Sequence, residues 1–285
     1  MEGNLTTIYV SQTVEHKGCV KSIEEALDMV SVLRKKGEKQ PVTIRIRDTI
    51  YTVTKPIMIG NNVNSVTIEP EHHTLISGGI EVKGFENDTF HGVKCVSVDL
   101  SCYGDLKFTD FYVNKKAAVM PKYPKEGTLS AEAVENPSTD LHAHSKWFVP
   151  KKEDFENISK FSDLENAIIS FNHWWVDEHS PIAAIDRVTR KISLKYQTRF
   201  SVSMESEKSA LQYVVENVAE MFANPNEWYY DRAVKKLYYI PETKKANAKE
   251  IVGFIPVTDK IFCLKGTQKE KVSDITIRNF DIGYG

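Results

Sequence analysis

The stretch Val42-Thr-Ile-Arg-Ile-Arg47 alternates apolar and polar residues, and Val66-Thr-Ile68 repeats its beginning 24 residues later. Alternation with a period of two is typical of a β-strand with one buried face, here the face of Val42, Ile44 and Ile46. A spacing of 24 residues fits one coil of a parallel β-helix, in which each strand lies on the equivalent strand of the coil before it. A β-sandwich of hairpins would also have short strands, so the spacing favours the solenoid without excluding the sandwich.

Other short apolar segments flank these two and are separated by turn residues such as Gly60-Asn-Asn62. They are Thr7-Ile-Tyr-Val10, Tyr51-Thr-Val53, Ile57-Met-Ile59, Leu75-Ile-Ser77 and, near the C-terminal end, Val272-Ser-Asp-Ile-Thr-Ile-Arg-Asn-Phe280. The last segment resembles the strand at Val66, and the sequence stops at Gly285, where a further coil would begin. Because a solenoid that ended there would have an unpaired edge, we expect the chain to be cut short and to associate through that open end.

A helix is predicted between the first two strands. Ser22 is a suitable N-cap and Glu25 completes a capping box. Apolar residues then fall on one stripe, at Ile23, Ala26, Leu27, Val30 and Leu33, and Gly37 is a natural stop. An open solenoid end exposes its core, so we expect this helix to cover it.

The middle of the chain, residues 105–256, interrupts the short-strand rhythm with a proline-containing connection. Strands are predicted at 167–171 and 191–196, and an apolar stripe from Leu211 to Phe222 suggests a helix. Trp228-Tyr-Tyr230 and Leu237-Tyr-Tyr-Ile240 indicate an aromatic hairpin. The prediction is therefore a mainly all-β protein: cap and first coils over 1–104, an inserted mostly-β subdomain over 105–256, and a return to the solenoid over 257–285.

The composition narrows the functional classes. Apolar residues make up 41% and charged residues 27%, as in soluble globular proteins, and the net charge of −2 gives no reason to expect nucleic acid as a partner. The four cysteines have no zinc-ligand spacing, so we expect free thiols, no metal and no cofactor. No apolar stretch has membrane-spanning length and no signal peptide is visible, which predicts a cytoplasmic protein, or an extracellular one if a leader was removed.

Several segments resemble the β-helix proteins of glycoside hydrolase family 141 and, more distantly, family 120 β-xylosidases. The opening strand, helix and Val42 strand look like the N-terminal cap of pectate-lyase-like β-helices. The other matching segments are Ile76-Ser-Gly-Gly79 with Val82-Lys-Gly-Phe85, Phe111-Tyr-Val-Asn114 with Met120-Pro-Lys-Tyr-Pro124, and Asn226-Glu-Trp-Tyr-Tyr-Asp-Arg232 with Leu237-Tyr-Tyr-Ile-Pro241. Lys115 and Asn226 stand where the family has glycine.

The resemblance implies a right-handed parallel β-helix that acts on a polysaccharide or oligosaccharide. It implies catalytic carboxylates on later coils, beyond residue 285, so no catalytic residue is assigned and this chain alone is expected to be inactive.

The best candidate for contact with a carbohydrate is Phe171-Asn-His-Trp-Trp-Val-Asp-Glu-His179. Sugars stack their apolar faces on aromatic rings, while carboxylates and imidazoles bind their hydroxyl groups. If the stretch is extended, His173, Trp175, Asp177 and His179 share one face and form a substrate-binding strip. The alternative is a tryptophan-containing core with polar residues at a strand edge.

Other constellations are weaker. Asp177 and Glu178 are adjacent and point to opposite faces of a strand, so they are a poor acid–base pair for glycoside hydrolysis. His142 and His144 could converge on a metal, but no third ligand is implied nearby. Three functions remain: a glycoside hydrolase represented by its N-terminal part, a non-catalytic glycan-binding or adhesion module, and a polysaccharide lyase or epimerase on the same scaffold.

Overall fold

The computed structural model describes residues 6–13, 18–137, 140, 142–173, 175–202, 212–243 and 246–285. Within these residues the chain is mainly β, with two α-helices, as expected. Contacts divide it into two compact units. Unit 1 comprises Met1–Val82, Leu106–Ala117 and Val252–Gly285, and unit 2 comprises Lys83–Asp105 and Ala118–Ile251. These boundaries differ from the predicted ones mainly in assigning residues 83–105 to the inserted unit. The three-part division remains a prediction.

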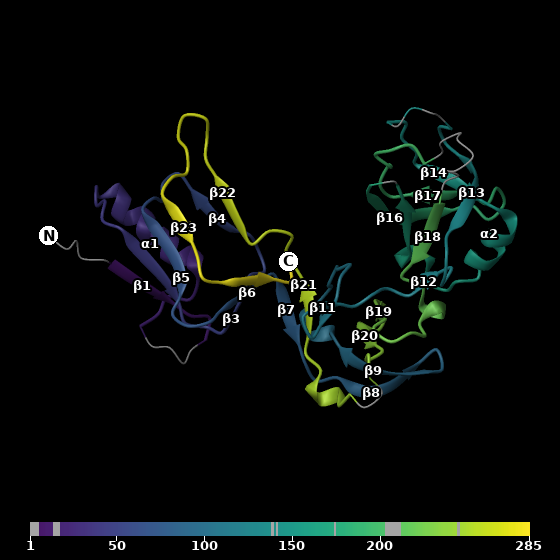
Figure 1. Cartoon of the computed structure of the whole chain (residues 1–285), viewed down its shortest axis with the longest axis horizontal. Coiled ribbons are helices and arrows are strands. Elements are labelled where there is room, and N and C mark those ends of the chain that lie inside the picture. Colours follow the sequence, from purple (N-terminus) through teal and green to yellow (C-terminus); the bar gives the residue numbers. More distant parts are fainter. Residues whose placement is uncertain are drawn as a thin grey trace. The chain divides into compact units, whose positions relative to one another are not determined.

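Unit 1 contains three sheets whose strands are all parallel (Figure 1). The first sheet is β1 (Thr6–Val10), β2 (Val42–Ile46), β5 (Val66–Pro70) and β23 (Ile275–Ile277); the second is β3 (Ile50–Thr52), β6 (Leu75–Ser77) and β24 (Asp281–Gly283); the third is β4 (Ile57–Gly60) and β22 (Phe262–Lys265). Val42 lies opposite Val66 and Ile44 opposite Ile68, so the 24-residue spacing seen in the sequence is the register of β2 on β5. The chain visits the three sheets in turn and then returns to the first.

The core of unit 1 is built from aligned aliphatic side chains. Ile8, Ile44 and Ile68 occupy matching positions of β1, β2 and β5 and are almost completely buried. The opposite face of the same strands is polar, with Arg45 beside Glu69. The alternation in the sequence therefore separates a buried apolar face from a polar one.

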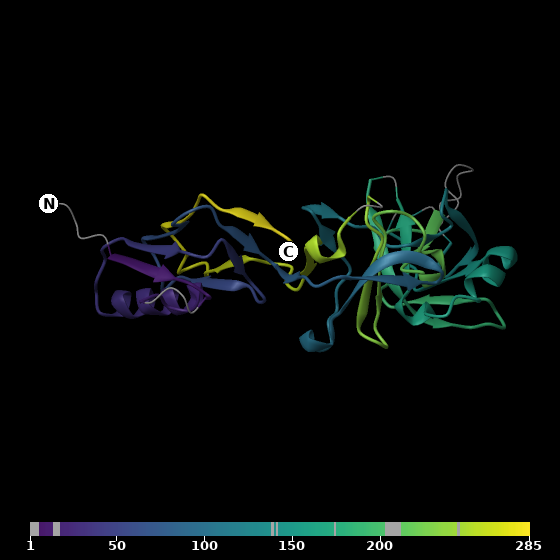
Figure 2. The same cartoon turned by 90° about the horizontal axis from the view of Figure 1, so that it is seen from below.

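Helix α1 (Ile23–Lys35) packs against β1, β2 and β4, and its buried residues Ile23, Ala26, Leu27 and Val30 join the same core (Figure 2). The Ser22 side chain accepts a hydrogen bond from the Glu25 N–H at 3.1 Å, as predicted. The Glu25 carboxylate accepts from the N–H of Lys21 and not of Ser22, so the capping box is not reciprocal.

A fourth, antiparallel sheet of unit 1 contains β7 (Gly79–Val82), β10 (Tyr112–Val113), β11 (Lys116–Ala117) and β21 (Gly253–Pro256). Lys115, in the turn between β10 and β11, has a φ of +65°, and Asn226 in unit 2 has a φ of +69°. Both are positions where the resemblance expects glycine, and left-handed backbone is where glycine has no steric cost.

In unit 2, a seven-stranded antiparallel sheet closes on itself, because β18 pairs with β13 on one edge and with β15 on the other. Its strands are β12 (Lys122–Tyr123), β13 (Leu129–Val134), β14 (Trp147–Pro150), β15 (Ile168–Asn172), β16 (Asp177–Ile185), β17 (Ile192–Leu194) and β18 (Gln212–Glu216). Helix α2 (Lys152–Ile158) contributes Phe155 and Ile158 to its core. We call this element the closed sheet.

The predicted helix over Leu211–Phe222 is wrong. Leu211 lies outside the described residues; β18 follows, and only a single 3-10 turn, η3 (Ala219–Met221), is helical. Tyr213, Val214 and Val215 are all buried. A strand buried on both faces has no polar alternation, and its continuous apolar run imitates a helical stripe.

A second sheet of unit 2 contains β8 (Glu86–Phe90), β9 (Val93–Asp99), β19 (Trp228–Asp231) and β20 (Lys236–Tyr239). Strands β19 and β20 form the predicted aromatic hairpin, with Tyr229 opposite Tyr238. Both rings stack on Phe90, so these tyrosines serve packing. The remaining 3-10 turns are η1 (Ser101–Tyr103), η2 (Leu164–Asn166) and η4 (Ala248–Glu250). No described helix is both long and apolar enough to cross a bilayer.

Candidate functional site

The segment predicted as one extended strip is a hairpin. Strands β15 and β16 are antiparallel, with Asn172 opposite Asp177, and the His173 N–H donates to the Val176 carbonyl at 3.0 Å. Residues 173–176 therefore form the connecting turn, and the expectation of four side chains on one extended face is wrong for His173 and Trp175. A continuous strand would leave the apolar residues of β16 without the pairing partners that the hairpin supplies.

Asp177 and His179 do lie on one face of β16. His179 is opposite Ser170 of β15, with 2.7 Å between its Nδ1 and the Ser170 Oγ and 3.5 Å to the Glu216 Oε2. The Ser170 hydroxyl donates to Glu216. Because Ser170 is only 3% exposed and its proton is directed to a carboxylate, this trio is a polar network across three strands and not a nucleophilic site.

His173 lies on the other side, near Glu178. Its Nε2 is 3.5 Å from the Glu178 Oε1. The two Glu178 carboxylate oxygens accept the backbone N–H groups of Arg199, at 2.9 Å, and Phe200, at 3.1 Å. Glu178 is therefore engaged in holding the 199–200 loop beside the hairpin turn, which removes it from the role of a catalytic acid.

That loop completes an aromatic cluster that the sequence analysis missed. The Trp175 side chain is 59% exposed, and its ring meets the Phe200 ring edge to face with centroids 5.4 Å apart. His173 and His142 also contact Phe200, at 5.7 and 5.9 Å, and the Arg199 guanidinium lies 5.4 Å from the same ring. We call these five residues the Trp175–Phe200 cluster. Phe200 is 25 residues from Trp175 in a polar segment, so no local pattern announces it.

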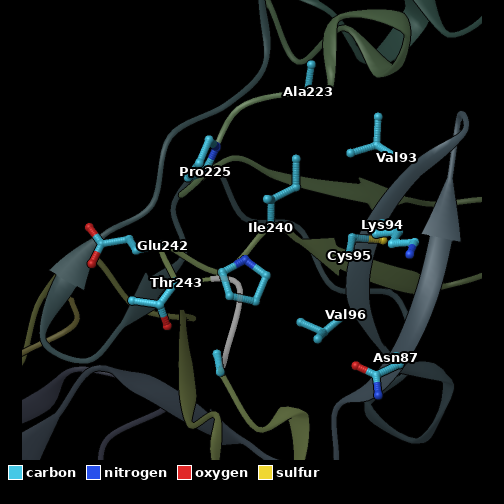
Figure 3. A pocket seen from close by; sticks show the side chains of 12 residues that line it. Asn87, Val93, Lys94, Cys95, Val96, Ala223, Pro225, Ile240, Glu242 and Thr243 are labelled. Carbon is cyan, nitrogen blue, oxygen red and sulfur yellow. The ribbon is translucent and has the colours of Figure 1, made fainter.

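Unit 2 also contains a pocket of about 720 Å³ (Figure 3). It is lined by Asn87, Val93, Lys94, Cys95, Val96, Ala223, Pro225, Ile240, Pro241, Glu242, Thr243 and Ala246. Its lining is mostly apolar, and Glu242 and Thr243 lie across the pocket from Lys94 and Cys95. The volume and the apolar lining with a few polar groups suit a small organic molecule.

Cys95 is not a nucleophile in this pocket. Its side chain is 5% exposed, and burial raises the pKa of the thiol to about 11. The thiolate is the reactive form of cysteine, and at neutral pH almost none is present. The pocket therefore offers shape and polarity without an activated group.

The other residues considered from the sequence have structural partners. His144 Nδ1 lies 2.7 Å from the Thr198 carbonyl oxygen, and Glu227 accepts the N–H groups of Ala223 and Asn224. Asp231 accepts the N–H groups of Ala233 and Val234 in the turn of the aromatic hairpin. Among the residues that the structure describes, no three His, Cys, Asp or Glu side chains gather as metal ligands would.

Comparison with known proteins gives one informative likeness, in structure. A solved protein described as a glycoside hydrolase superposes with a TM-score of 0.73 at 16% sequence identity. The match covers 98% of this chain and 50% of that protein, so the chain spans about half the length of the structure it matches. No family model matches the sequence, and no curated protein matches it either. At this identity the likeness establishes a shared fold.

Proposed function

We propose that this chain is the N-terminal part of a glycoside hydrolase built on a right-handed parallel β-helix that acts on a polysaccharide or oligosaccharide. The observation that carries the proposal is the structural likeness to a glycoside hydrolase along 98% of the chain. The three parallel sheets of unit 1 support it, because β2, β3 and β4 are followed in the same order by β5 and β6 stacked on the first two of them. That is the arrangement of successive coils.

In this proposal the first coils are β1 to β6, α1 covers their end, and unit 2 is an insertion between β6 and the strands β22 to β24. The resemblance to glycoside hydrolase family 141 is retained as part of the proposal. A strand edge formed by β23 and β24 would receive the next coil.

We place the catalytic carboxylates on coils after residue 285. Glycoside hydrolysis needs two carboxyl groups facing one another across the scissile bond, about 5 to 10 Å apart. Asp177 and Glu178 point to opposite faces of β16, and Glu178 is engaged with two backbone N–H groups. Neither therefore supplies such a pair.

A glycan-binding or adhesion module is the second candidate, favoured by the exposed ring of Trp175. Under either candidate His173, Trp175, Asp177 and His179 remain the proposed contacts, although the hairpin distributes them over two surfaces.

Hydrolysis assays separate the two functions. Aryl glycosides and plant polysaccharides are incubated with this chain and with a version extended through the following coils. Activity of the extended version alone supports the hydrolase and the position of its carboxylates. Activity of the shorter chain contradicts that position, and glycan binding by both without hydrolysis favours the binding module.

A further inference from the structure

We propose that the Trp175–Phe200 cluster is a carbohydrate subsite, in which the exposed face of Trp175 stacks on the apolar face of a pyranose ring. This inference rests on the proposed action on carbohydrates and identifies where in unit 2 a sugar would bind. It differs from the sequence-based strip, because it includes Phe200 and Arg199 and leaves His179 to its network with Ser170 and Glu216.

The Trp175 ring is both exposed and supported. Its side chain is 59% exposed, so a large part of the indole is available to a ligand. Phe200 meets the ring edge to face, at an interplanar angle of 72°. Such an arrangement stabilises an aromatic pair and limits rotation of the indole. An aromatic ring held in place before binding costs less conformational entropy when the ligand stacks on it.

The supporting ring is itself fixed by hydrogen bonds. The Phe200 N–H donates to the Glu178 carboxylate at 3.1 Å, and the neighbouring Arg199 N–H donates to its other oxygen at 2.9 Å. Glu178 belongs to β16, which the Ser180, His179 and Asp177 pairings tie to β15. The cluster therefore stands on the closed sheet and not on a loop alone.

Polar groups of both signs surround the stacking surface. The Asp177 side chain is exposed at the first position of β16, two residues from Trp175, and the exposed Arg199 guanidinium lies against Phe200. A pyranose ring has one apolar face of C–H groups and a rim of hydroxyl groups that donate and accept hydrogen bonds. An exposed indole with a carboxylate and a guanidinium at its side matches that division of the ligand.

Binding of a defined set of oligosaccharides tests the subsite. The wild-type chain is titrated with xylo-, cello- and manno-oligosaccharides and with oligogalacturonides, and affinity is measured by calorimetry and by the change in tryptophan fluorescence. We expect binding of at least one member, and a loss of about tenfold or more in Trp175→Ala. Phe200→Ala should lose less, because it removes the support and not the stacking face.

Tyr196→Ala is the matched control. Its ring is 58% exposed on the same closed sheet, but its ring contact is with Lys195. We expect wild-type affinity in this variant. Trp175→Phe should recover part of the affinity lost in Trp175→Ala, since it retains an aromatic face; a variant that had merely misfolded would show no such graded recovery.

Three results would overturn the subsite. One is wild-type affinity in Trp175→Ala. Another is no binding to any oligosaccharide while the extended protein hydrolyses polysaccharides, which rejects the subsite and leaves the proposed hydrolase intact. The third is a dimer in sedimentation that Trp175→Ala dissociates, without glycan binding, which would make this surface a contact between two copies of the chain. If the extended protein also neither binds nor hydrolyses, both proposals fail.

Discussion

Replacing Glu69 with glutamine should weaken the first parallel sheet of unit 1. Glu69 lies opposite Arg45 in the register of β2 and β5 and is 8% exposed. One carboxylate oxygen accepts from Arg45, and the other accepts from Arg278 Nε and Nη2 at 2.9 and 2.8 Å. A single charge thus joins strands from residues 42–46, 66–70 and the segment after β23, and glutamine would leave two guanidinium groups beside a neutral side chain.

The magnitude follows from the exposure of the three partners. Breaking a fully buried ion pair costs about 3–5 kcal/mol, and an exposed pair is worth about 0.2–1 kcal/mol. The side chains of Arg45 and Arg278 are 34% and 57% exposed, so water screens both, Arg278 the more. We therefore expect a loss near the middle of this range, about 2 kcal/mol, in the free energy of opening the sheet, which is about a 30-fold change in the equilibrium constant.

Hydrogen exchange of peptides covering β2 and β5 measures this opening directly. Glu71→Gln is the control, because Glu71 pairs with a single arginine, Arg47, at 2.8 Å, and both side chains are 28% exposed. Its expected loss is below about 1 kcal/mol. Equal acceleration of exchange in the two variants would refute the reasoning that the shared carboxylate of Glu69 is worth more than an isolated pair.

The same contact predicts a dependence on pH. Hydrogen bonding to Arg45 and then to Arg278 lowers the pKa of Glu69 from its ordinary value of 4.5. A group with a depressed folded pKa contributes stability above its unfolded pKa and loses it as the pH falls through the folded value. The difference in urea midpoint between wild type and Glu69→Gln should therefore be full at pH 7 and shrink below about pH 4; a difference that stayed constant down to pH 2 would contradict the assignment.

Four further substitutions test other parts of the fold, each by the urea or thermal unfolding of the unit concerned. Ser22→Ala removes the N-cap acceptor of α1 and should cost about 1 kcal/mol; no change would mean that the cap is unimportant. Gly253→Ala would bring a Cβ within 2.4 Å of the Phe111 ring and should cost about 1–3 kcal/mol, so a neutral result would contradict the close approach. Lys115→Gly relieves a left-handed residue and should be neutral or stabilise by up to about 1 kcal/mol, whereas a clear loss would contradict the φ of +65°. Tyr213→Phe removes a buried hydroxyl with no hydrogen-bond partner among the described residues and should not destabilise, and a loss above about 1 kcal/mol would show that the hydroxyl is bonded.

Local signals predicted most of unit 1 and failed where burial changed their meaning. The N-cap at Ser22, the period-two stretch at Val42 and the aromatic hairpin each correspond to an observed element. In β18 the same reading produced a helix, since a strand buried on both faces has no alternation to detect. In β15 and β16 it produced one strand where there are two, because the turn at residues 173–176 has no glycine or proline to mark it.

The sequence by itself determined which residues are buried on one face of each short strand and that β2 and β5 are one register apart, because side-chain period and repeat length are properties of the chain alone. Only the tertiary structure decided which distant residues meet. Closure of a sheet through β18 and β15, the sharing of Glu69 by two arginines, and the contact of Trp175 with Phe200 all join segments whose separation carries no local pattern. Such contacts arise from the packing of whole elements, so the candidate carbohydrate surface could be suspected from Trp175 but not assembled until the hairpin and the 199–200 loop were placed.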